Sequence, residues 1–179
     1  ARMIAKSGAK PKRTILFIGF AGEEFGLLGA QAWVKAHKDK LPKIANLFNR
    51  DGGPEPPVGI SVPQAMYDDF VKISEPIQKI RPDYPFEVKV REPRKRPTRM
   101  GGTDASVFAI EGVPTLGFTT EDFKGYDFDY GEIWHTERDL YTKNIPEYQE
   151  HTATVTAIIA LGVANLDKQL SREGLYTEE

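Results

Sequence analysis

The stretch Thr14-Ile-Leu-Phe-Ile-Gly-Phe-Ala-Gly-Glu-Glu-Phe-Gly-Leu-Leu-Gly29 places two adjacent acids directly after an apolar run. Residues 15–20 are typical of a buried strand, and the glycines after them indicate the turn that ends it. Open α/β sheets form binding crevices at the carboxyl ends of their strands, so we expect Glu23 and Glu24 to face such a crevice. In adjacent carboxylates, one can ligate a metal ion while the other moves a proton. An acidic helix start, which the helix dipole favours, explains the pair equally well when it is taken alone.

Two further residues favour the metal interpretation. Asp51 lies in Leu47-Phe-Asn-Arg-Asp-Gly-Gly53, directly after a second short apolar run. His135 lies in Glu132-Ile-Trp-His-Thr-Glu-Arg-Asp139, a loop ahead of the C-terminal helix. Glu, Asp and His form a ligand set suited to zinc. Because each candidate follows an apolar run and precedes a turn or helix, we expect them to converge on one edge of one sheet.

Four motifs, in this order, resemble the M28 family of zinc-dependent exopeptidases. They are Ala21-Gly-Glu-Glu-Phe-Gly-Leu-Leu-Gly-Ala30, Asn49-Arg-Asp-Gly-Gly53, Gly101-Gly-Thr-Asp-Ala-Ser-Val-Phe-Ala-Ile-Glu-Gly-Val-Pro114 and Trp134-His-Thr-Glu-Arg-Asp139. The resemblance runs from about Arg13 to about Leu170. It implies an aminopeptidase or carboxypeptidase acting on peptide or aminoacyl substrates, with two zinc ions in the complete domain. A secreted or periplasmic location is also implied.

The resemblance further implies a role for each acid and for the histidine. Glu23 takes the position of the general base, Glu24 binds one metal ion, and Asp51 binds the other. His135 completes the ligand set of that second ion. Asp104 occupies the family's Thr-Asp or Ser-Asp position beside the metal ligands. The alternative for Asp104 is a carboxylate at a helix N-terminus, stabilised by about 0.3–1 kcal/mol through the dipole.

Residues 121–132 form an acidic and aromatic segment that leads into His135. The segment is too irregular for a strand and is typical of an active-site loop. Tyr126 and Tyr130 within it are candidates for lining a substrate pocket. The alternative is that these tyrosines only anchor the loop.

The chain departs from the family pattern upstream of the paired glutamates. The family has a His-x-Asp motif and a metal-bridging Asp there, and residues 1–13 contain neither His nor Asp. His37-Lys-Asp39 has the same spacing, but it follows the glutamates on a polar helix face. We therefore expect residues 1–179 to be a single, partial zinc-peptidase domain whose N-terminal part is missing. Such a chain is expected to bind little metal alone, to have low activity, and to expose a sheet edge that favours homo-oligomers.

Two other functions compete with the exopeptidase. A glutaminyl cyclase-like enzyme with a single zinc ion also uses Trp-His-Thr, but Gly-Leu-Leu-Gly after the glutamates resembles the peptidases more closely. A non-catalytic binding module on the same fold is the third possibility. The intact Glu-Glu pair, Asp51 and His135 argue against it.

Composition limits the class of protein. The length of 179 residues predicts one domain, and contents of 40% hydrophobic and 28% charged residues are those of a soluble globular protein. A formal charge of −2 argues against nucleic acid as a general partner. There is no cysteine, so thiolate metal sites are excluded. No apolar run approaches the roughly 18 residues of a membrane span, so none is expected.

Alternating apolar and helical patterns predict an α/β fold: a three-layer sandwich with a mostly parallel central sheet flanked by helices. Strands are expected at residues 14–20, 43–48, 58–62, 86–90 and 114–118, the fourth as a half-exposed or edge strand. Helices are expected at 28–37, at 66–80, at 104–111 after a Thr103 cap, and from Pro146 onward. Pro76 should kink or shorten its helix. Residues 91–99 are interpreted as a solvated loop and 173–179 as a frayed tail.

Overall fold

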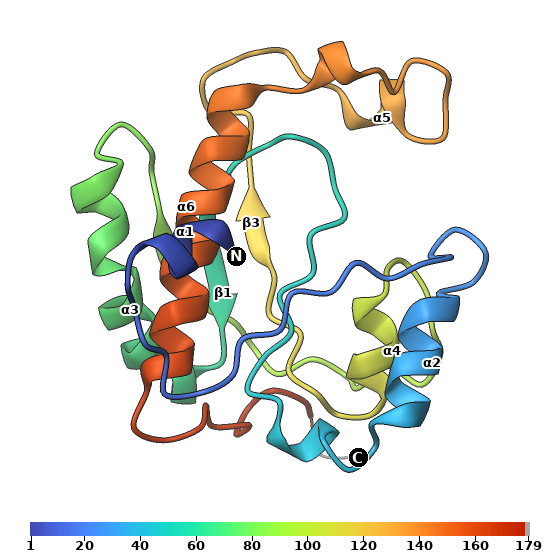
Figure 1. Ribbon diagram of the computed structural model, residues 1–179, viewed down its shortest axis with the longest axis vertical. Coiled ribbons are helices and arrows are strands. Elements are labelled where there is room, and N and C mark those ends of the chain that lie inside the picture. The colour runs from blue at the N-terminus through green and yellow to red at the C-terminus, as the bar shows by residue number, and fades with distance from the viewer. Residues whose placement is uncertain (178–179) are drawn as a thin grey trace.

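The computed structural model describes residues 1–177, which form a small sheet flanked by helices (Figure 1). The strands lie in the order β2-β1-β3, so β1 (Pro57–Val62) lies between β2 (Glu87–Val90) and β3 (Phe118–Thr120). β1 pairs with β2 in parallel and with β3 in antiparallel orientation. The predicted α/β class is confirmed, but the described sheet is mixed rather than mostly parallel. β2 is an edge strand, as its alternation of charged and apolar residues predicts.

The α-helices of the described residues are α1 (Arg2–Lys6), α2 (Leu28–Ala36), α3 (Tyr67–Ile80), α4 (Ala105–Ile110), α5 (Tyr130–Ile133) and α6 (Pro146–Asn165). The four helices expected from the sequence correspond to α2, α3, α4 and α6. Short 3-10 helices occupy Leu41–Lys43, Gln64–Met66 and Tyr141–Lys143. Within residues 1–177, no helix combines the length and apolar character needed to cross a membrane.

The main core lies between the sheet and the helix pair α3–α6, which stand side by side in Figure 1. Phe70, Ile73 and Ile77 share the buried face of α3, as their spacing of three and four residues predicts. Ile60 of β1 and Ile159 of α6 belong to the same cluster. This core fixes α6, whose N-terminal end borders the loop that leads to His135.

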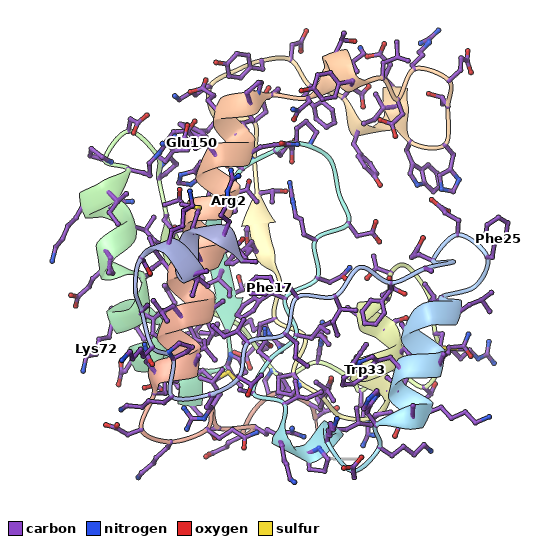
Figure 2. The ribbon with its side chains drawn as sticks, in the orientation of Figure 1. Arg2, Phe17, Phe25, Trp33, Lys72 and Glu150 are labelled. Atoms are coloured by element: carbon purple, nitrogen blue, oxygen red, sulfur yellow. The ribbon has the colours of Figure 1, made fainter. Side chains whose placement is uncertain are left out.

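A second apolar cluster joins α2 to α4, which lie beside each other away from α3 and α6 (Figure 1). Ala30 and Val34 of α2 are buried with Val107 and Phe108 of α4. The Trp33 ring, labelled in Figure 2, lies 5.4 Å from the Phe108 ring. This cluster anchors the two helices that follow the Glu23-Glu24 turn and the Asp104 motif.

The predicted strand at residues 14–20 is wrong. The segment runs extended across the molecule, but it pairs with no strand of the described sheet (Figure 1). Leu16, Phe17 and Ile18 are 62%, 54% and 43% exposed. An apolar run becomes a strand only where a neighbouring strand can accept and donate its backbone hydrogen bonds.

The predicted strand at residues 43–48 is also wrong. Among the described residues, one backbone hydrogen bond resembles strand pairing: the Leu47 N–H donates to the Pro114 carbonyl at 2.9 Å. The Asn46 side chain supplies two more, accepting from the Leu116 N–H at 2.9 Å and donating to the Leu116 carbonyl at 3.2 Å. A side-chain amide therefore takes the place of a backbone ladder, and β3 begins only at Phe118.

Two helix predictions need correction. Pro76 lies inside α3, which runs without a break from Tyr67 to Ile80 because its apolar face is held in the core. The N-cap position of α4 belongs to Asp104 rather than Thr103, and no side chain caps the helix.

The basic segment is a mostly exposed loop, as predicted, but it is tied to the domain, and the C-terminal tail is not frayed up to residue 177. Arg96 donates from Nε to the Ile110 carbonyl at 2.9 Å, at the end of α4. Arg94 forms a β-bridge with Tyr176. Leu175 is buried in the main core. Residues up to 177 therefore dock on the domain, and residues 178–179 of the predicted tail lie outside the described residues.

Candidate active site

Glu23 and Glu24 lie on a tight turn between the extended segment and α2. Backbone hydrogen bonds to the Glu23 carbonyl close this turn. At its end, an added Cβ on Gly29 would lie 2.7 Å from backbone atoms of Ala21, so only glycine fits. Figure 2 shows Phe25 at the outer tip of the turn. The glycine-rich sequence thus reverses the chain and leaves the two acids at the surface.

His135 meets this turn directly, with its Nε2 atom 3.0 Å from Glu24 Oε2. The two side chains are 53% and 64% exposed, so both remain accessible to a ligand. His135 has a φ of 57°, in the left-handed region that residues other than glycine seldom adopt. The Thr136 hydroxyl donates to the Glu132 carbonyl at 2.8 Å and so stabilises the turn that carries His135. An uncommon backbone conformation therefore directs this imidazole toward the acidic turn.

Asp51 and Asp104 bring two more carboxylates to the same site. Loss of hydration raises the pKa of Asp51, and the charge of Glu24 raises it further. Asp104 is 7% exposed, and burial followed by the charge of Asp51 raises its pKa. Its Oδ1 atom has no hydrogen-bond partner among the described residues. A cation or an ordered water would supply the missing partner of such a buried oxygen.

Glu23 is surrounded by these charges. Loss of hydration is the largest cause that raises the pKa of Glu23. Three carboxylates raise it further and one imidazole lowers it, in the order Asp51, Glu24, Asp104 and His135. A raised pKa makes a carboxylate a stronger base, which suits a group that accepts and returns protons. The charges of four predicted site residues thus act on Glu23, and the Glu24–His135 pair is in direct contact.

The donors fit a divalent cation in their chemistry. Four carboxylates and one imidazole lie near one another with the Asp104 oxygen unpaired, and oxygen with imidazole nitrogen is a set that zinc accepts. Within residues 1–177, however, no three His, Asp or Glu side chains converge closely enough to hold an ion by themselves. The residues present therefore supply part of a zinc site, in which the Glu24–His135 contact is the best-formed element.

The His37-Lys-Asp39 sequence plays no part in this arrangement. His37 Nδ1 lies 2.9 Å from the Trp33 carbonyl oxygen, and its ring stacks on Trp33 with centroids 4.4 Å apart. This histidine therefore belongs to the end of α2.

A cavity of about 650 Å³ adjoins Asp51. Tyr130, Ile133, Lys143 and Asn144 line it together with residues of α6. Tyr130 therefore lines a cavity, and its contact with substrate stays a prediction.

Tyr126 lies elsewhere: it lines a second cavity of about 530 Å³ that does not include Asp51. Its hydroxyl donates to the Glu147 carboxylate. For Tyr126 the anchoring alternative fits the structure better.

Sequence reasoning missed two residues of the larger cavity. Lys143 lies there within 2.9 Å of Glu132 Oε2, and the Asn144 Oδ1 atom is buried without a hydrogen-bond partner among the described residues. Neither residue lies in a recognisable motif. The sequence indicated them only through their position between the His135 motif and Pro146, because that segment connects the site to the start of α6.

Comparison with known proteins gives three results. The family model of peptidase family M28 matches residues 1–159. Carboxypeptidase Q of Mus musculus is 23% identical over 175 residues, which cover 95% of this chain and 33% of that protein. A probable zinc metalloprotease of Phaeosphaeria nodorum is 45% identical over 51 residues, which cover 28% of this chain and 10% of that protein.

A solved structure shares the fold. The crystal structure of a peptidase M28 precursor from Shewanella amazonensis matches with a TM-score of 0.68 and 25% identity, covering 92% of this chain and 34% of that chain. The chain thus spans about a third of the length of these relatives. The family model covers most of the chain, and the motifs that it spans include the Glu23-Glu24 turn and His135. This chain belongs to peptidase family M28.

Proposed function

We propose that this chain forms part of the active site of a zinc-dependent exopeptidase that removes residues from a peptide terminus. The observation that carries the proposal is the contact of His135 with Glu24, because it joins two distant motifs at one accessible point. Asp51 and Asp104 lie close enough to raise the pKa of neighbouring carboxyls. The names of the relatives, carboxypeptidase Q and zinc metalloprotease, favour peptide hydrolysis over cyclisation.

Glu24, His135 and Asp51 would hold zinc, and we propose two ions in the whole protein. Zinc, when bound, acts as a Lewis acid on water and on a carbonyl group. Within residues 1–177 too few donors converge for a closed site, so we propose that further ligands complete it. Asp104 would orient the ligands from its buried position at the start of α4.

Glu23 would act as the general base. Its carboxylate is close to the other acids but is not in the Glu24–His135 contact, so it remains free to move a proton. Its raised pKa favours taking a proton from water and passing it to the leaving amine. The cavity beside Asp51, with Tyr130 in its wall, would receive the terminal residue of the peptide.

Substitution of the two glutamates in the whole protein tests these roles. Glu23→Gln should leave bound zinc nearly unchanged and lower the turnover of a dipeptide substrate by about 10²–10⁴-fold. Glu24→Gln should instead reduce the zinc that survives dialysis. Metal analysis and dipeptide kinetics measure both. Glu137→Gln is the matched control, since this exposed acid lies near His135 in sequence and should change neither quantity.

Equal zinc loss in Glu23→Gln and Glu24→Gln would show that the roles are assigned wrongly. Full turnover in Glu23→Gln would exclude it as the general base. A whole protein that binds no zinc and cleaves no peptide would favour the binding-module alternative.

A further inference from the structure

The loop between β3 and α5 has no regular structure of its own, yet it leads to His135. Figure 1 shows it passing the N-terminal end of α6 before it reaches α5. A loop without backbone ladders takes its position from side-chain contacts. The contacts that hold this loop therefore decide where His135 lies.

Glu147, in the first turn of α6, contacts two side chains of this loop. Its Oε2 atom lies 2.8 Å from Lys124 Nζ and accepts from the Tyr84 hydroxyl at 3.1 Å. Its Oε1 atom accepts from the Tyr126 hydroxyl. One carboxylate therefore binds two residues of the loop and one residue beyond α3.

A second tie lies next to it. The Tyr148 hydroxyl donates to Asp122 Oδ1 at 2.6 Å and accepts from the Lys124 N–H at 2.9 Å. Asp122 also accepts from the Tyr126 N–H at 3.0 Å, which folds the loop on itself. Tyr148 is buried in the molecule, so this tie joins the loop to the rigid part of α6.

The charge of Glu147 suits this task at any physiological pH. The hydrogen bond from Lys124, followed by that from Tyr126, lowers the pKa of Glu147 to about 2. Its place at the start of a 20-residue helix also favours a negative charge. Glu147 therefore stays negatively charged and keeps its capacity to accept hydrogen bonds from the loop.

We propose that Glu147 is a positioning residue: by clamping Lys124 and Tyr126, it holds the loop so that His135 meets Glu24. Glu147 touches neither Glu24 nor His135 through any bond described above, so it acts through the loop alone. This inference rests on the proposed function, because His135 is a zinc ligand only under that function.

Glu147→Gln in the whole protein tests the proposal. A glutamine side chain offers one acceptor oxygen in place of two and turns an N–H group toward donors, so the clamp loses at least one contact. Glu150→Gln is the matched control: it lies on α6 (Figure 2), pairs with Arg81 at 3.1 Å, and has no described contact with the loop. Lys124→Met should reproduce the effect of Glu147→Gln, and Lys124→Arg should largely restore the original behaviour.

Two quantities are measured: hydrogen exchange of residues 121–135 and zinc affinity by competition with a chelator. Glu147→Gln should speed exchange in the loop by about tenfold or more, with β1 unchanged. It should weaken zinc binding by about 10–100-fold, the usual effect of removing a group that orients a ligand. Glu150→Gln should leave both quantities as they were.

Unchanged loop exchange in Glu147→Gln would overturn the clamp. Faster exchange with unchanged zinc affinity would show an anchor that does not position His135, and would overturn the proposal as well. His135→Gln separates this from the proposed function. If His135→Gln itself leaves zinc affinity unchanged, the assignment of His135 as a ligand fails, whatever Glu147 does.

Discussion

Two apolar segments of this chain, residues 14–20 and β1, have opposite outcomes. Each offers a short run of β-branched and other apolar residues. β1 is paired on both sides and buries Ile60 and Val62 almost completely. The other segment pairs with no described strand and leaves Leu16 and Phe17 more than half exposed. Apolar sequence therefore selects an extended chain, and the availability of neighbours decides whether that chain becomes a strand.

Residues 14–20 are held mainly at their two ends. The Lys12 N–H donates to Asn165 Oδ1 at 3.0 Å, which ties the start of the segment to the end of α6. At the other end, the Phe20 ring lies 5.8 Å from that of Phe108. Between these points the backbone has no ladder. Substitutions in this segment should therefore affect stability much less than equivalent changes in β1.

The largest contrast should come from removing apolar bulk. Ile60→Ala should lower the free energy of unfolding by about 2–5 kcal/mol, because it leaves a cavity in the main core. Ile18→Ala should change it by no more than about 0.5 kcal/mol, since that side chain is 43% exposed. Urea denaturation of the chain measures both. Similar losses for the two variants would mean that residues 14–20 are packed in solution as firmly as β1.

A glycine pair sharpens the comparison at the level of the backbone. An added Cβ at Gly59 of β1 would lie 2.5 Å from the Glu87 carbonyl oxygen of β2, whereas at Gly19 it would meet nothing within 4 Å. Gly59→Ala should therefore destabilise the fold by about 1–3 kcal/mol. Gly19→Ala should be neutral, or stabilising by up to about 1 kcal/mol through a less flexible unfolded chain. Thermal unfolding of both variants checks this, and a destabilised Gly19→Ala would contradict the open surroundings of residue 19.

The smallest contrast concerns pH. His151 is fully buried, with Nε2 3.0 Å from the Pro57 carbonyl at the start of β1 and its ring stacked on Tyr84. Burial is the main cause that lowers the pKa of His151. The charges of Arg81 and Lys124 lower it further, while the Pro57 hydrogen bond and the Asp83 charge oppose this.

The unfolded chain therefore binds more protons at His151 than the folded chain does below about pH 6.5. This contribution to stability is complete above that pH and is lost as the pH falls, by at most about 1.4 kcal/mol per unit. Unfolding free energies between pH 7.5 and 5 should show the slope. It should flatten in His151→Gln and persist in His37→Gln. If the slope is unchanged in His151→Gln, the pH dependence comes from other groups. Residues 14–20 contribute nothing to it, because they contain no titratable side chain.

The candidate site and the sheet differ in how far the sequence predicted them. Glu24 and His135 were expected near one sheet edge because each follows an apolar run, and their side chains lie 3.0 Å apart. The buried face of α3 was also correct, since three- and four-residue spacing is a local property that packing rarely overrides. Their roles as base and ligands stay predictions until metal binding is measured.

The sequence by itself determined the family, the long helices and β1, and it predicted the acids of the candidate site. Only the tertiary structure decided that Asn46 replaces a strand ladder at Leu116, that Leu175 enters the core, and that Tyr126 binds Glu147 rather than facing Asp51. The physical reason is the range of the interactions. The spacing of apolar residues indicates which face of a helix or strand is buried, and this spacing can be read within a few residues of sequence. A hydrogen-bond partner or a strand neighbour lies far away in the chain, so it exists only once the chain has folded.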